Sequence, residues 1–165
     1  MKTMNVLREG LLVGVVGAAA LALWFLIVDA ANGQPLHTPA ALGAGLFRGE
    51  RAIEALTMPA GAAGLIVGYT VFHVAVFVAA GIILSGVMHV LEAEPALFLL
   101  AFFGLFVFFE FTYYVFVLVF VLRVLQEISW PVLLIGNAIA VAAMGFLLWQ
   151  SHPRLHFKWE PKFGS

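Results

Sequence analysis

One glutamate stands inside one of the most apolar stretches of this 165-residue chain, FFEFTYYVF. Glu110 is the only charged residue between Pro95 and Leu122. An ionised carboxylate at the centre of a membrane-spanning helix costs at least about 2.5–3.5 kcal/mol on insertion scales. We therefore expect Glu110 to face other helices, to be protonated, or to have a polar partner.

His73 is the best candidate partner, because it also lies well inside an apolar run. If a turn near Ala93 joins the two runs, His73 lies 20 residues before the turn and Glu110 lies 17 residues after it. A difference of three residues is about 4.5 Å along a helix axis. The two side chains are therefore predicted to lie at similar depth, with Asn137 in the same half of the bilayer. The predicted intramembrane polar cluster comprises Glu110, His73, Tyr113, Tyr114, Thr70, Tyr69 and Asn137.

Four interpretations of this cluster are compatible with the sequence. In the simplest, the hydrogen bonds of the cluster fix the packing of the helices. In the second, His73 and Glu110 exchange protons or handle ions, since these groups can transfer protons near neutral pH. In the third, His73 ligates a metal or a haem, although the sequence offers no complete ligand set at that depth. In the fourth, a protonated Glu110 faces lipid.

A second group of candidate metal ligands lies where the chain is expected to leave the membrane. His89 and Glu92 are one helical turn apart, and His152 and His156 follow the last apolar run. Imidazole and carboxylate groups are suitable ligands for transition metals. The spacing matches no zinc motif, however, so solvated residues at the membrane surface are the competing interpretation.

The composition excludes several classes of function. The chain is 64% hydrophobic and 10% charged, whereas soluble domains are about half apolar and about a quarter charged. A net charge of −1 gives no electrostatic basis for binding nucleic acid. The absence of cysteine excludes thiolate catalysis, cysteine-held zinc and iron–sulfur clusters. No phosphate-binding loop, dinucleotide fingerprint, zinc-protease helix or nucleophile elbow occurs, so no catalytic residue is predicted.

These polar residues must be positioned by helices, because the apolar runs are long and lack the alternation of a strand. A spanning helix needs about 20 mostly apolar residues. The chain is therefore predicted to be all-α, a single membrane domain over residues 1–165 that forms a bundle of four transmembrane helices. The predicted spans are about 10–28, 61–88, 96–122 and 131–149, and residues 150–165 form a tail.

Local signals refine this prediction. Pro95 and Pro131 stand where helix starts are expected, because a first-turn proline loses no hydrogen bond. Residues 37–57 are predicted to form a short helical connector that lies on the membrane surface between the first two spans. Small residues recur at four-residue spacing, which lets helix backbones approach closely in lipid. These pairs are Gly10 with Gly14 and Gly64 with Gly68.

The distribution of basic residues predicts the orientation. Five Lys or Arg residues fall on the side of the two termini and three on the other side. Basic loops favour the cytoplasm, so both termini are predicted to be cytoplasmic, in a bacterial inner membrane.

The main functional hypothesis is a non-catalytic subunit or self-assembling component of a membrane complex. Its partners would be membrane lipids and other membrane subunits or further copies of the same chain. The alternative is a proton- or ion-coupled transporter, a channel or a redox membrane protein that uses His73 and Glu110. A third hypothesis is a metal or haem carrier.

Overall fold

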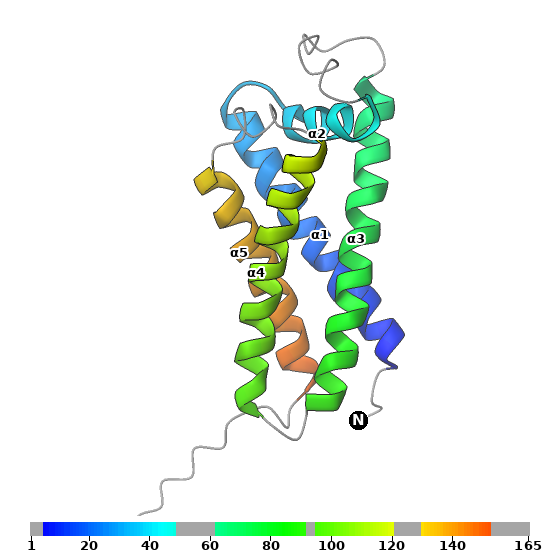
Figure 1. Cartoon of the computed structure of the whole chain (residues 1–165), viewed down its shortest axis with the longest axis vertical. Coiled ribbons are helices and arrows are strands. Elements are labelled where there is room, and N and C mark those ends of the chain that lie inside the picture. The colour runs from blue at the N-terminus through cyan, green and yellow to red at the C-terminus, as the bar shows by residue number, and fades with distance from the viewer. Residues whose placement is uncertain (1–4, 49–61, 92–94, 121–129, 153–165) are drawn as a thin grey trace, which may run out of the picture.

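A computed structural model describes residues 5–48, 62–91, 95–120 and 130–152, and all its regular elements are α-helices. The helices are α1 (Val6–Ala31), α2 (His37–Arg48), α3 (Ala62–Leu91), α4 (Pro95–Phe120) and α5 (Trp130–Ser151). The four longer helices, α1, α3, α4 and α5, run alternately up and down, and α2 lies across one end (Figure 1). The start of α1 and the ends of α3 and α5 lie at the other end of the bundle. The predicted all-α class is confirmed.

Three helices in the described part of the chain are long and apolar enough to cross a membrane. They cover Val6–Ala31, Ala62–His89 and Trp130–Ser151. In α4, a helix of 26 residues, the fully described apolar segment is Phe103–Thr112, which by itself does not reach the roughly 20 residues of a span. The four-span bundle therefore stays a prediction. Pro95 and Pro131 do stand in the first turns of α4 and α5, as expected.

Glycines let α1 and α3 cross at very short distance. A methyl group placed on Gly14 would lie 2.5 Å from the backbone oxygen of Phe77, and one on Gly10 would also meet the backbone of α3. Gly81 of α3 faces the backbone of α1 in the same way. The predicted close approach at Gly10 and Gly14 is confirmed, whereas a methyl group on Gly64 would have nothing within 4 Å.

The helix α1 also packs closely against α5, so it lies between two neighbours. Gly17 faces the side chain of Met144, and Gly136 faces Trp24. The indole N–H of Trp24 donates a hydrogen bond of 2.8 Å to the carbonyl of Val132, at the start of α5. Because α1 contacts both α3 and α5, residues near its first turn are brought to the ends of those two helices.

Asp29 ties the end of α1 to the start of α2. Gly33, with a φ of +73°, adopts the left-handed conformation that turns the chain out of α1. The buried carboxylate of Asp29 accepts one hydrogen bond from the backbone N–H of Thr38 and one from its hydroxyl, both of 2.7 Å. A side-chain oxygen that accepts from a first-turn N–H stabilises a helix start. The helical part of the predicted connector is thus present over His37–Arg48, and its residues 49–57 lie outside the described residues.

Candidate functional site

Glu9 is a buried carboxylate in the first turn of α1, with only 2% of its surface exposed. The partial positive charge at a helix N-terminus stabilises a carboxylate in this position. The close crossing at Gly10, the next residue, holds this turn of α1 against the last turns of α3. Glu9 is therefore placed by the same contact that sets the register of the two helices.

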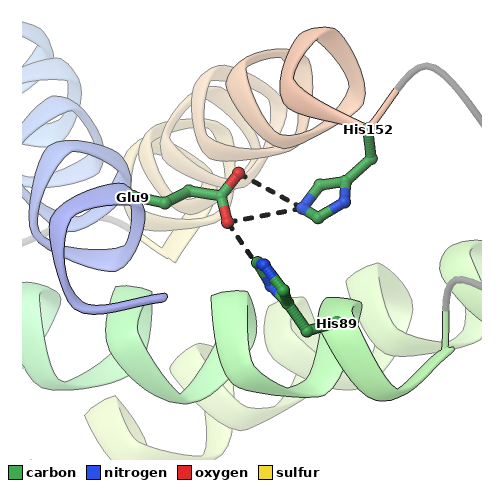
Figure 2. Close-up of side chains that lie close together, drawn as sticks. All are labelled: Glu9, His89 and His152. Atoms are coloured by element: carbon green, nitrogen blue, oxygen red, sulfur yellow. Dashed lines mark hydrogen bonds and ion pairs between the residues drawn. The ribbon is translucent and has the colours of Figure 1, made fainter. Parts of the chain in front are cut away.

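Three side chains from the ends of two other helices approach the Glu9 carboxylate, and Figure 2 shows the two histidines among them. The hydroxyl of Ser85 donates a hydrogen bond of 2.6 Å to Oε2. Nε2 of His152 lies 3.2 Å from Oε1 and 3.3 Å from Oε2. Nδ1 of His89 lies 3.7 Å from Oε2 and donates a hydrogen bond of 3.0 Å to the backbone oxygen of Ser85. We call Glu9, His89 and His152 the Glu9 cluster.

The ends of α3 and α5 favour positive charge at this place. His89 lies in the last turn of α3, and His152 directly follows the last residue of α5. Helix C-termini carry partial negative charge and stabilise cations within about one turn. The two imidazole rings meet edge to face, with their centroids 5.1 Å apart. His152 is buried, whereas 31% of the His89 side chain is exposed.

The Glu9 cluster has the ligand types and the spacing of a transition-metal site. Its three ligand atoms all lie within 4.8 Å of one another. Ligands at about 2.0–2.2 Å from a tetrahedral metal are about 3.4 Å apart. Oε2 of Glu9 lies 3.3 Å from Nε2 of His152 and 3.7 Å from Nδ1 of His89, which is close to that separation. Two imidazoles with one carboxylate are the protein ligands of many zinc sites and of non-haem iron sites. Small shifts of the side chains would therefore admit an ion.

The structure brings two of the four predicted metal ligands together. His89 and His152 both contact Glu9, whereas Glu92 and His156 lie outside the described residues. Sequence analysis missed Glu9, because an acid just before an apolar run is ordinary at a membrane surface. One signal could have found it, since Glu9 continues the buried helical face that includes Val13 and Gly17.

The two residues of the predicted His73–Glu110 pair have different hydrogen-bond partners. Nε2 of His73 donates a hydrogen bond of 3.2 Å to the backbone oxygen of Ala18 in α1. Oε1 of Glu110 accepts a hydrogen bond of 2.7 Å from Nδ2 of Asn137 in α5. Within the predicted polar cluster, the structure therefore joins Glu110 to Asn137 and turns His73 toward another helix.

The orientation of the helices explains this difference better than their depth does. Phe77, one turn after His73, stacks on Phe109 with ring centroids 4.7 Å apart. This contact shows that α3 and α4 lie side by side near the level of His73 and Glu110. The glycine crossing, however, turns the His73 face of α3 toward α1. Glu110, the residue after Phe109, points toward α5 instead.

The remaining predicted residues are distributed around these two sites. The ring of Tyr69 lies 5.8 Å from that of His73. The hydroxyl of Thr70 donates a hydrogen bond of 2.7 Å to a carbonyl one turn earlier in its own helix. Tyr114 is 42% exposed, and the side chain of Tyr113 lies outside the described part of the chain.

No protein-family model matches the chain, and the comparisons with curated proteins and with solved structures find no match either. The functional argument therefore rests on the chemistry of the Glu9 cluster and of the other described sites.

Proposed function

We propose that this chain is a small integral membrane protein that binds a divalent transition-metal ion, such as Zn²⁺, at Glu9, His89 and His152. One observation carries the proposal: a buried carboxylate and two imidazoles from three helix ends have their ligand atoms within 4.8 Å of one another. A carboxylate buried to this degree is costly unless it is paired or coordinates a metal.

To hold an ion, the three ligand atoms would have to be free of protons. Nε2 of His152 and Nδ1 of His89 would each lose a proton to become ligands, and Glu9 would bind as the carboxylate. The hydroxyl of Ser85, already bonded to Glu9, would orient that carboxylate from outside the ligand set. Three protein ligands leave a coordination position for water or a further ligand. The partly exposed His89 side chain offers the ion a route from the aqueous side.

Metal titration of the purified full-length chain tests the proposal. The protein in mild detergent is treated with a chelator, and Zn²⁺ binding is measured by calorimetry. One ion per chain is expected. Glu9→Gln keeps the shape but removes the charge, so we expect affinity to fall at least about 100-fold, beyond the roughly 10–100-fold effect of losing an outer partner. Acidification should also weaken binding, because protons compete for all three ligands.

Glu110→Gln is the matched control, because it makes the same change at another glutamate within a helix. It should leave Zn²⁺ affinity unchanged, since Glu110 bonds to Asn137 outside the cluster. A wild-type chain without stoichiometric binding would contradict the proposal. Equal losses in the two glutamine variants would contradict it as well.

Insertion as four spans with both termini in the cytoplasm is part of the same proposal. Three long apolar helices and the alternating up-and-down order of the four long helices support it. Because the chain has no cysteine, single cysteines can be introduced at Lys2 and Ser165 and labelled from one side of the membrane. Both should react from the cytoplasmic side, and labelling from opposite sides would rule out an even number of spans.

The other functional hypotheses differ in their support. Assembly with partner subunits or further copies stays a prediction, because exposed apolar side chains are needed against lipid as well as against protein. Co-purification from the native membrane would test it. Transport through His73 and Glu110 has less support than metal binding, because the two residues have separate partners on different helices.

A further inference from the structure

A groove of about 300 Å³ lies between α1, α3 and the start of α2, far along the bundle from the Glu9 cluster. Leu23 and Leu26 form part of its wall and are 58% and 41% exposed. The groove thus opens on a side of the bundle that lipid would cover. Its other walls are mainly apolar, and its polar lining residues are Thr38, Tyr69, Thr70 and His73.

Three of these polar lining residues have their described donor hydrogens in use, which leaves acceptor lone pairs for a ligand. The hydroxyl hydrogen of Thr70 is used within α3, and that of Thr38 is used on Asp29. Nε2–H of His73 donates to the backbone oxygen of Ala18. In a neutral imidazole the other nitrogen, Nδ1, is then an acceptor, and no described residue donates a hydrogen bond to it. A ligand that satisfies these groups must itself donate hydrogen bonds.

The groove also selects against charged ligands. Of the described residues that line it, none carries a formal charge. Asp29 lies behind Thr38, and both of its carboxylate oxygens accept hydrogen bonds from that residue. A phosphate or carboxylate head would lose its hydration in this groove without gaining a counter-charge, which is strongly unfavourable.

Aromatic rings shape the groove for a flat head group. The rings of two lining residues, Tyr69 and His73, have centroids 5.8 Å apart. Phe77, which lies outside the lining, supports the His73 ring at a centroid distance of 4.7 Å. Phe25, which is buried, lines another side. Aromatic rings prefer offset or edge-to-face contacts with other rings. Ligand sites typically have volumes of roughly 300–1,000 Å³. The groove is near the lower end of that range, so it can hold one substituted ring and the start of a tail.

We propose that this groove binds the aromatic head of a membrane-dissolved quinol-type lipid, with a ring hydroxyl donating to Nδ1 of His73. The oxidised quinone has carbonyl acceptors in place of hydroxyl donors, so its lone pairs would face those of His73 and the two threonines. The site therefore binds the reduced form more tightly than the oxidised form. This inference concerns binding alone and does not depend on the Glu9 cluster.

Binding of a short-chain benzoquinol and of the matching quinone, each with one isoprene unit, tests this inference. Affinities are measured without oxygen on the full chain in mild detergent. The quinol should bind at least about tenfold more tightly, which is the net effect of about one hydrogen bond. His73→Phe keeps an aromatic ring, should weaken quinol binding about tenfold and should abolish the preference. Val71→Ala, at an exposed site on the same helix, is the matched control.

A second variant protects the test against misfolding, because His73→Phe also removes the partner of the Ala18 carbonyl. Ala22 is an exposed residue of the groove wall, so Ala22→Trp should fill the groove without disturbing the core. It should abolish binding of both probes and leave the unfolding temperature unchanged. Equal affinities for quinol and quinone, or full binding by Ala22→Trp, would overturn the proposal. So would a phospholipid that co-purifies in the groove and is displaced by neither probe.

Discussion

Glu9 and Glu110 are both glutamates in apolar helices, yet their surroundings differ in kind. Glu9 is 2% exposed, and Ser85, His89 and His152 approach it from the ends of two other helices. Glu110 is only partly buried, and it accepts a hydrogen bond from a single amide, that of Asn137. The first arrangement can hold a cation among three ligands. The second satisfies one acid with one neutral donor.

This difference shows that apolar neighbours along the chain do not indicate which acid has potential metal ligands around it in space. Glu110 is conspicuous in the sequence because its neighbours along the chain are apolar. Glu9 is inconspicuous because Arg8 precedes it and the apolar run begins only after it. What gives Glu9 its ligand-like environment is the meeting of three helix ends, where helix dipoles favour the acid on α1 and cations at the ends of α3 and α5.

The largest expected effect comes from breaking the helix crossing that positions Glu9. Gly14→Leu would drive a side chain into the backbone of α3, where even a methyl group would lie 2.5 Å from Phe77. Since backbone cannot give way cheaply, we expect a loss of more than about 4 kcal/mol in the free energy of unfolding. Loss of Zn²⁺ binding should accompany it. Unfolding in mixed micelles and metal titration measure the two effects.

Gly64→Leu is the control for this prediction, because a methyl group on Gly64 would have open space around it. Its unfolding free energy should change by less than about 0.5 kcal/mol. An equally small change for Gly14→Leu would mean that the α1–α3 contact does not set the position of Glu9. The helix crossing would then not explain why Glu9 and Glu110 have different surroundings.

Much of this fold can be predicted from local sequence signals. Long apolar runs predict α1, α3 and α5, Pro95 and Pro131 predict two helix starts, and the glycine spacing in α1 predicts its close contact. These features succeed because each depends on residues close together in the chain. The rotation of each helix about its own axis depends on contacts between residues far apart in the chain. For that reason the sequence predicts the depth of His73 relative to Glu110, but not that the His73 side chain faces α1.

The candidate site is predictable only in part, for the same reason. His89 and His152 are recognisable as potential ligands by residue type, and the topology puts them at one end of the bundle. Their common partner, Glu9, depends on the register of α1 against α3. That register follows from the contact of Gly10 and Gly14 with Gly81. These contacts join residues 67 and 71 positions apart, and no spacing rule within one helix can reveal them.

Replacing either glutamate by leucine should reduce the free energy of unfolding less than Gly14→Leu does. Glu9→Leu deprives the Ser85 hydroxyl and the His152 N–H of their acceptor, and each buried donor left unsatisfied costs about 1–3 kcal/mol. Glu110→Leu deprives only the Asn137 amide, at a partly buried site. In metal-free protein, Glu9→Leu should therefore reduce the free energy of unfolding more than Glu110→Leu does. Denaturant titration in mixed micelles provides the comparison.

Glu110→Gln should give the smallest effect of this series. The glutamine keeps a side-chain oxygen that can accept the hydrogen bond from Asn137, so we expect a change of less than about 0.5 kcal/mol in unfolding free energy. Such a result would mean that Glu110 acts as a hydrogen-bond acceptor, whereas Glu9 acts through its charge. A loss as large as that of Glu110→Leu would instead show that the acidic group itself matters, and the distinction between the two glutamates would have to be abandoned.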